Sequence, residues 1–291
     1  MREDANMGRL IPKLIFDTSA INALANDGDV RAISEAICIA YEFVITETVL
    51  SEIVADPDEA RRNHRLDVMK RLLMCGKCAM PFHWIIEEHA KAYQQNPKDY
   101  DWEKLNVRFL EAEHEIARQN FLHSLSAETL THNRNAEDQF IALFATARPH
   151  FQKLFVDGKE RPSLEEVANI LVRKGGAHFE IAMDLYERAA GRRPSDGEIK
   201  DFVERCPPFK ALIMALCFSQ YDICIRRDNA PRLGKAGRQD MFSAVFLPYC
   251  KLFVTNDEGQ YKALKMVADL SGLETTILMS EDFKRSLGLV G

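Results

Sequence analysis

Two short apolar runs, one near each end of the chain, lead into an aspartate. Residues 13–16 precede Asp17, and residues 251–255 precede Asn256 and Asp257. A short apolar run predicts a buried strand, and the acid then lies at the carboxyl end of that strand. Ligands of open parallel sheets bind at this edge. Two carboxylates at one edge repel each other unless a cation lies between them, so the pair predicts a divalent metal site.

Two further acids have comparable positions. Glu52 lies on a predicted helix after the second predicted strand, and Asp240 opens a predicted helix directly before residues 251–255. Four carboxylates at one edge become tolerable around hard cations, which prefer oxygen ligands. No His or Cys adjoins any of these acids in the sequence, which argues against zinc. We therefore expect one or two Mg²⁺ or Mn²⁺ ions, held by four catalytic carboxylates: Asp17, Glu52, Asp240 and Asp257.

Such a site suits phosphodiester hydrolysis, because one cation lowers the pKa of a bound water and a second stabilises the leaving oxygen. Neighbouring hydroxyl and amide groups would orient the ligands. The residues placed for this are Thr18, Ser19, Thr255 and Asn256. A basic stretch before Asp240 could bind phosphates, or could be a solvated loop that neutralises nearby acids. Its candidate phosphate ligands are Arg232, Lys235 and Arg238.

The predicted elements place these residues on an α/β scaffold. Strand and helix signals alternate over residues 13–56, with strands at 13–16 and 42–46 and helices at 20–25, 30–40 and 47–55. They alternate again from residue 236, with helices at 239–246 and 260–269 and strands at 251–255 and 274–278. Helical crossovers between strands predict parallel pairing. We expect a three-layer α/β/α sandwich with a central parallel sheet.

The segment between these halves has a different character. Strand signals nearly vanish from residue 58 to residue 235, and helical periodicity dominates. The sequence therefore predicts a discontinuous α/β core formed by residues 1–57 and 236–291, with an all-helical insertion over residues 58–235. The insertion could shape substrate selection, or present a surface to a protein partner or to a second copy of the chain.

Composition limits the class of protein. The 291 residues carry a formal net charge of −6, which argues against a protein that coats nucleic acid with a general basic surface. An enzyme that acts on nucleic acid through a local acidic site remains compatible with this charge. No stretch approaches the ~20 apolar residues needed to cross a bilayer, and the first residues lack the apolar region of a signal peptide. We expect a cytoplasmic protein with no membrane partner.

Seven cysteines are present, most of them in apolar stretches. Cys75 and Cys78 form a CxxC pair, which could be half of a zinc site or a redox pair. No second CxxC or HxxxH pattern accompanies it. Free, structural thiols in a reducing compartment are the favoured interpretation.

Three segments together resemble the PIN-domain family of metal-dependent ribonucleases: LIFDTSAIN, FVITETVLSEI and GRQDMFSAVFLPYCKLFVTNDEGQY. The family has an aspartate after its first strand, a glutamate on the helix after the second, an aspartate opening a later helix and a T-[ND]-D motif after the next strand. Asp17, Glu52, Asp240 and Asp257 match these positions. The resemblance covers residues 13–56 and 236–279, and the long insertion departs from compact members. It implies an α/β/α fold and a Mg²⁺- or Mn²⁺-dependent endoribonuclease, a hydrolase of single-stranded RNA.

Other interpretations stay open. Asp17 and Asp240 could be simple helix N-caps. The chain could be a DNA-directed nuclease, or a catalytically silent PIN-like scaffold that binds a protein partner. A phosphatase of the haloacid-dehalogenase type also has an aspartate after its first strand, but it needs a second acid two residues later, where this chain has Ser19. That alternative is disfavoured.

Overall fold

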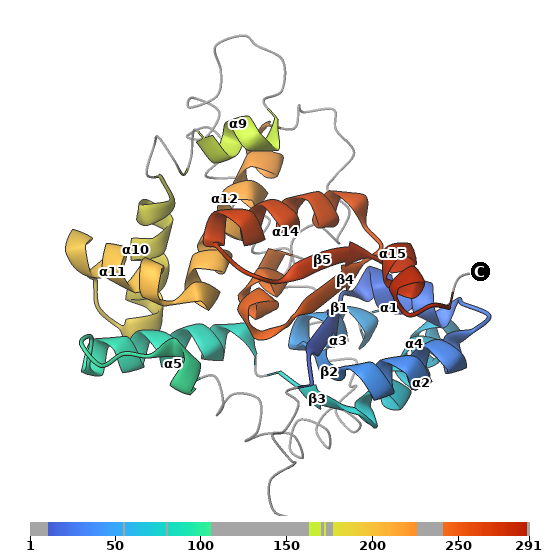
Figure 1. Cartoon of the computed structure of the whole chain (residues 1–291). Helices are drawn as coiled ribbons and strands as arrows, with labels where there is room; N and C mark the ends of the chain where they lie inside the picture. The colour runs from blue at the N-terminus through green and yellow to red at the C-terminus, as the bar shows by residue number, and fades with distance from the viewer. Residues whose placement is uncertain are drawn as a thin grey trace, which may run out of the picture.

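A sheet of five parallel strands, in the order β3-β2-β1-β4-β5, forms the centre of the molecule (Figure 1). The computed structural model describes residues 11–54, 56–79, 81–105, 163–169, 172, 177–225 and 241–289. The strands are Lys13–Phe16 (β1), Glu42–Ile45 (β2), Gly76–Cys78 (β3), Leu252–Thr255 (β4) and Thr276–Met279 (β5). The chain is therefore an α/β protein with an all-parallel sheet, as the sequence predicts.

One face of the sheet is covered by helices that follow the strands closely in the chain. These are Thr18–Ala25 (α1), Val30–Ala40 (α2), Glu47–Val54 (α3), Glu59–Leu73 (α4) and Ser280–Ser286 (α15). Alternate side chains of a strand point to opposite faces, and Leu14 and Phe16 of β1 therefore pack with these helices. Phe16 meets Phe43 and Phe283 edge to face in the same core.

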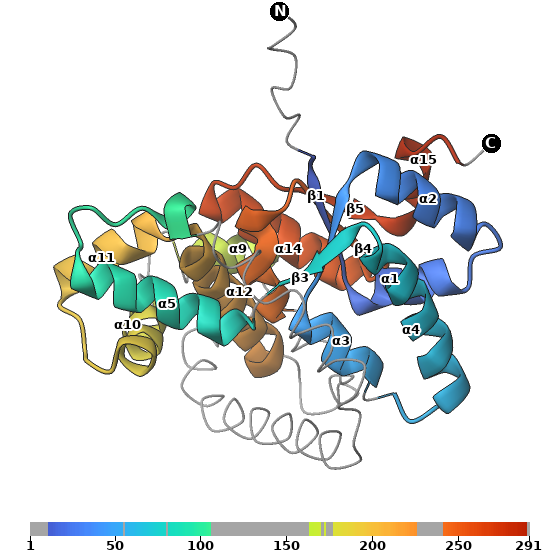
Figure 2. The same cartoon turned by 90° about the horizontal axis from the view of Figure 1, so that it is seen from below.

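The other face packs against a larger group of helices. They are Phe82–Gln95 (α5), Leu164–Ala168 (α9), Ala177–Ala190 (α10), Asp196–Arg205 (α11), Pro207–Ile225 (α12), Glu258–Ser271 (α14) and the 3₁₀ helix Ser243–Tyr249 (η2). Ile15 of β1 and Phe253 of β4 point into this second core. Figure 2 shows α5, α10, α11 and α12 gathered on one side of the sheet, with α1, α2 and α4 on the other. The arrangement is consistent with a three-layer sandwich.

Strand β3 is the element that the sequence pattern does not predict. It lies within residues 58–235, where only helices are expected, and it has three residues with no apolar alternation. Its backbone approaches β2 so closely that a Cβ on Gly76 would lie 2.5 Å from the Phe43 carbonyl oxygen. Tertiary packing therefore forms this strand, whereas the division into a core and an insertion stays a prediction.

Two other elements differ from the prediction. Residues 243–249 form a 3₁₀ helix instead of part of an α-helix over 239–246, and Pro248 lies inside it. Helix α15 follows β5 directly and was not expected. Among the described residues, no helix combines the length and apolar character needed to span a bilayer.

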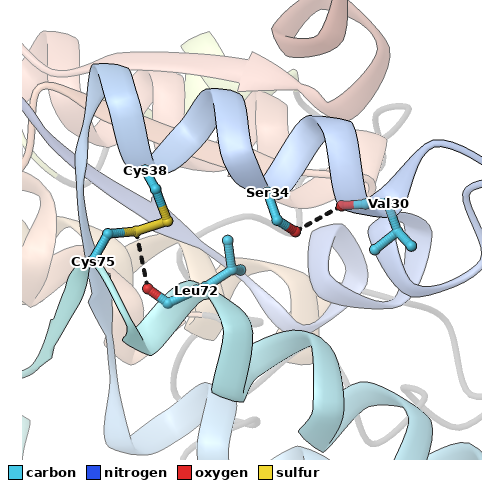
Figure 3. The surroundings of a disulfide bond; sticks show 5 residues. All are labelled: Val30, Ser34, Cys38, Leu72 and Cys75. Carbon is cyan, nitrogen blue, oxygen red and sulfur yellow. Dashed lines mark hydrogen bonds between the residues drawn. A yellow bond between two sulfur atoms is a disulfide. The ribbon is translucent and has the colours of Figure 1, made fainter.

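A disulfide joins Cys38 at the end of α2 to Cys75, just before β3 (Figure 3). The expectation of free thiols is wrong for these two residues, because the fold brings their Cα atoms to 5.2 Å. It is correct for Cys206, Cys217 and Cys250, which are buried thiols. Disulfides are rare in reducing compartments, and the cytoplasmic location stays a prediction.

A buried histidine ties the second group of helices to the element that precedes β4. The His89 ring on α5 hydrogen-bonds the Tyr249 hydroxyl at 2.9 Å and the Tyr100 hydroxyl at 2.8 Å. Burial lowers the pKa of His89 to about 4, so the ring is neutral near pH 7 and has one donor and one acceptor nitrogen. The bond to Tyr249 holds η2 against α5, and β4 follows η2 directly in the chain.

Candidate functional site

Asp17 and Asp257 lie at the carboxyl ends of the two neighbouring strands β1 and β4. The Asp17 N–H donates to the Val254 carbonyl at 3.0 Å, which places Asp17 directly beside the end of β4. Each aspartate is also a helix N-cap: Asp17 accepts from the Ala20 N–H at 2.7 Å, and Asp257 accepts from the Gln260 N–H at 2.8 Å. The fold therefore brings both acids to one edge of the sheet, each at the positive end of a helix dipole.

Two hydroxyl groups orient the Asp17 carboxylate. The Ser19 hydroxyl lies 2.9 Å from Oδ1 and 2.8 Å from Oδ2, and the Thr255 hydroxyl lies 2.7 Å from Oδ2. The two hydroxyl oxygens are 3.2 Å apart. Asn256 joins the cluster through its backbone N–H, which donates to the Ser19 hydroxyl at 2.7 Å. Thus Ser19 and Thr255 contact Asp17 through their hydroxyl groups, while the Asn256 contact is made by the backbone.

The Asp17 carboxyl group is almost fully buried, with 2% of the residue exposed. Burial raises its pKa to about 6, and the hydrogen bonds from Ala20, Thr255 and Ser19 offset only part of that effect. Repulsion from the Asp257 carboxylate raises the pKa further. A cation bound at this edge would lower the free-energy cost of keeping the two carboxylates ionised.

Glu52 joins this edge through the residue that follows Asp17. It is half-buried on α3, and the Thr18 hydroxyl donates to its Oε2. Thr18 therefore acts on Glu52, not on Asp17. Within the part of the chain that the structure describes, no group of three His, Cys, Asp or Glu side chains is close enough to hold a metal ion. The fourth predicted ligand, Asp240, and the candidate phosphate ligands Arg232, Lys235 and Arg238 lie outside the described residues.

A second acidic residue near α3 has a structural role that the sequence does not reveal. The Asp56 carboxylate is buried and accepts two hydrogen bonds of 2.6 Å from the Arg61 guanidinium. Arg65 donates to the same carboxylate at 2.8 Å and to Asn22 of α1 at 2.7 Å. These charged groups hold α4 against α1, the helix that Asp17 caps.

Gln260 is the residue of this site that sequence reasoning missed. Its amide oxygen lies 2.6 Å from the Thr255 hydroxyl, and its backbone N–H donates to the N-cap residue Asp257. The available signal is spacing: Asp257 and Gln260 are three residues apart, as in a capping box. A helix cap, however, does not predict a contact with the strand end that precedes it.

The carboxylate, hydroxyl and amide oxygens at this edge form a donor set that suits a hard cation. Comparison of the chain with family models, curated proteins and solved structures finds no match. A functional conclusion therefore depends on the residues of this edge.

Proposed function

We propose that this chain is a metal-dependent nuclease that hydrolyses phosphodiester bonds, with single-stranded RNA as its favoured substrate. The observation that carries the proposal is the buried Asp17 carboxylate, which Asp257 repels at the carboxyl edge of a parallel sheet. Burying a carboxylate near a second one is unfavourable unless a cation or a proton compensates. We propose that a bound cation compensates the negative charge of Asp17 and Asp257 at this edge.

The oxygen donors fit Mg²⁺ or Mn²⁺. A carboxylate has about four lone-pair sites, and three donors occupy Asp17, which leaves capacity for one further ligand bond. Asp17 and Asp257 would hold the cation. Glu52 and Asp240 are the further ligands that the sequence predicts, although, among the described residues, the structure does not group Glu52 with the two aspartates closely enough to hold a metal. A divalent cation held there lowers the pKa of a bound water and stabilises the charge that develops on a phosphodiester.

The chain's own residues would fix the geometry. Ser19 and Thr255 hold the Asp17 carboxylate in one orientation by donating to it. The exposed Asn256 and Asp257 face solvent, where a substrate can reach them. The preference for RNA over DNA and the PIN-like assignment follow from the sequence resemblance alone, and they belong to this proposal.

A second candidate function is a catalytically silent scaffold that binds a protein partner. It is favoured by the fact that Asp17 and Asp257 both serve as helix N-caps with protein donors already bound. N-capping accounts for an aspartate at each position without any metal. It does not account for the burial of Asp17, because an N-cap gains nothing from losing solvent.

Cleavage of a labelled single-stranded RNA by the full chain separates the two candidates. We expect cleavage that requires Mg²⁺ or Mn²⁺, stops with EDTA and falls at least 100-fold in Asp17→Asn and Asp257→Asn. Asp58→Asn is the matched control, because Asp58 caps α4 through the same type of bond at an exposed position. A single-stranded DNA of the same sequence tests substrate choice. A wild-type protein that neither binds the cation nor cuts either strand supports the scaffold.

A further inference from the structure

Gln260 is connected to both carboxylates of the site, to Asp257 directly and to Asp17 through Thr255. Its backbone N–H donates directly to Asp257 Oδ1 at 2.8 Å. Its side-chain amide lies 2.6 Å from the Thr255 hydroxyl oxygen, which in turn lies 2.7 Å from Asp17 Oδ2. Gln260 is 5% exposed and Thr255 is fully buried, so water does not compete for these bonds. One residue therefore links Asp257 to Asp17 through a single hydroxyl group.

The Thr255 hydroxyl has more acceptors than hydrogens. It carries one hydrogen, yet both Asp17 Oδ2 and the Gln260 amide oxygen lie within hydrogen-bond distance. Its oxygen already accepts from the Asp257 N–H at 3.0 Å. The hydrogen points to Asp17 when that group is ionised, because a hydrogen bond to a carboxylate is stronger than one to a neutral amide. The contact between Thr255 and the Gln260 oxygen would then contain no hydrogen.

The Gln260 amide also has an unused donor. Its Nε2 is buried and has no hydrogen-bond partner among the described residues. A buried N–H without a partner is costly and rare. A half-turn about the last side-chain bond exchanges the amide nitrogen and oxygen without moving any other group. The nitrogen then donates one hydrogen to Thr255, and the Thr255 hydrogen no longer has to serve both the Gln260 oxygen and Asp17.

We infer that Gln260 donates from its amide to the Thr255 hydroxyl and so acts as a positioning residue for the Asp17 and Asp257 carboxylates. With the amide as donor, the Thr255 hydrogen no longer has the Gln260 oxygen as an acceptor. Asp17 Oδ2 at 2.7 Å is closer and, when ionised, a stronger acceptor than the Ser19 hydroxyl at 3.2 Å. The same residue holds Asp257 through its backbone, so the two carboxylates keep a fixed relative orientation. This role rests on the proposed function, because these carboxylates are the proposed cation ligands.

The orientation of the amide is tested first in the metal-free wild-type protein. Side-chain NMR should show nuclear Overhauser contacts from the Gln260 amide hydrogens to the Thr255 side chain. Contacts from these hydrogens only to groups away from Thr255 would overturn the inference. This measurement needs neither metal nor a variant that must fold.

The effect of Gln260 on the carboxylates is tested by Mn²⁺ binding, which is measured by electron paramagnetic resonance of the free ion. Gln260→Met keeps the length of the side chain and removes the donor, and we expect about tenfold weaker Mn²⁺ binding. Thr255→Val should have a similar effect, and the double variant should bind no more weakly than Thr255→Val alone. Ser271→Ala is the matched control, because the Ser271 hydroxyl lies on the same helix and is also buried with no hydrogen-bond partner in the described part of the chain.

The outcomes separate the two levels of the proposal. Unchanged Mn²⁺ affinity in Gln260→Met, or full additivity in the double variant, overturns the positioning role. A wild-type protein that binds no Mn²⁺ overturns the proposed function, and the NMR contacts alone then decide whether Gln260 donates to Thr255.

Discussion

Thr255 and Asp17 are separated by 238 positions in the sequence, and the Thr255 hydroxyl donates to Asp17 Oδ2 over 2.7 Å. This bond joins the two ends of the chain at the carboxyl edge of the sheet, since β1 and β4 are neighbours there. It orients a carboxylate that is almost fully buried. The raised pKa of this carboxylate leads to the first prediction.

Asp17→Asn should stabilise the metal-free protein above pH 7. The folded pKa of Asp17 is raised from 3.8 to about 6, so the contribution of Asp17 to stability is most favourable below pH 4 and is lost as the pH rises through 6. Ionisation of the folded group then costs about 3 kcal/mol, and asparagine, which cannot ionise, avoids this while still accepting from Ala20. Urea unfolding at pH 4 to 8 should show a flatter pH dependence in the variant. A less stable Asp17→Asn protein at pH 8 would contradict the prediction.

Asp56 should show the opposite pH dependence. Its pKa is lowered to about 2, first by the hydrogen bond from Arg61, so the stability it provides is present above pH 4 and is lost as the pH falls toward 2. Asp56→Asn leaves the nearly buried Arg65 without its charged partner, and we expect a loss of about 2–4 kcal/mol near pH 7. Urea unfolding of the wild type and of Asp56→Asn measures this loss of stability.

Glu35→Gln is the control for Asp56. It breaks the exposed ion pair between Arg31 and Glu35, which should change stability by less than about 0.5 kcal/mol. Equal effects of the two substitutions would show that Asp56 does not anchor α4.

Gly76→Ala should destabilise the edge of the sheet. The added Cβ would lie 2.5 Å from the Phe43 carbonyl oxygen and 2.9 Å from that of Leu72, and neither backbone atom can move freely. A cost of about 1–3 kcal/mol is expected from such overpacking. Gly28→Ala is the control, because a Cβ there meets nothing within 4 Å. Thermal unfolding of both variants measures the difference, and an unaffected Gly76→Ala protein would argue against the pairing of β3 with β2.

Loss of the Cys38–Cys75 disulfide should destabilise the protein by about 2–4 kcal/mol, because the bond closes a loop between residues 37 positions apart. Thermal unfolding with and without a reductant measures this loss. The double variant Cys38→Ser/Cys75→Ser should match the reduced wild type and should not respond to the reductant. A wild-type protein whose unfolding ignores the reductant would contradict the presence of the bond.

The sequence predicts the sheet well where its residues carry their own signal. The runs at β1, β2 and β4 are apolar and bounded by polar residues, and their parallel pairing follows from the helices between them. Strand β3 carries no such signal, because Gly76, Lys77 and Cys78 become a strand only when packed against β2. The Cys38–Cys75 disulfide could not be predicted from the sequence either, since it depends on the placement of α2 beside the end of α4.

Some features of the candidate site could also be predicted from the sequence, and others could not. Asp17 and Asp257 could be predicted to share an edge, because that follows from strand order alone. The burial of Asp17 and the Gln260 contact could not, because they depend on how α14 packs beside β4. Glu52 reaches the edge through Thr18, a hydrogen bond between side chains that spacing does not reveal.

The most direct test of the cation site is a crystal of the full chain grown with Mn²⁺ and examined by anomalous scattering. We predict a Mn²⁺ peak at about 2.0–2.5 Å from carboxylate oxygens of both Asp17 and Asp257. We also predict that this peak is absent in crystals of Asp17→Asn. A wild-type crystal in millimolar Mn²⁺ with no anomalous peak at these two carboxylates would contradict the proposed cation site.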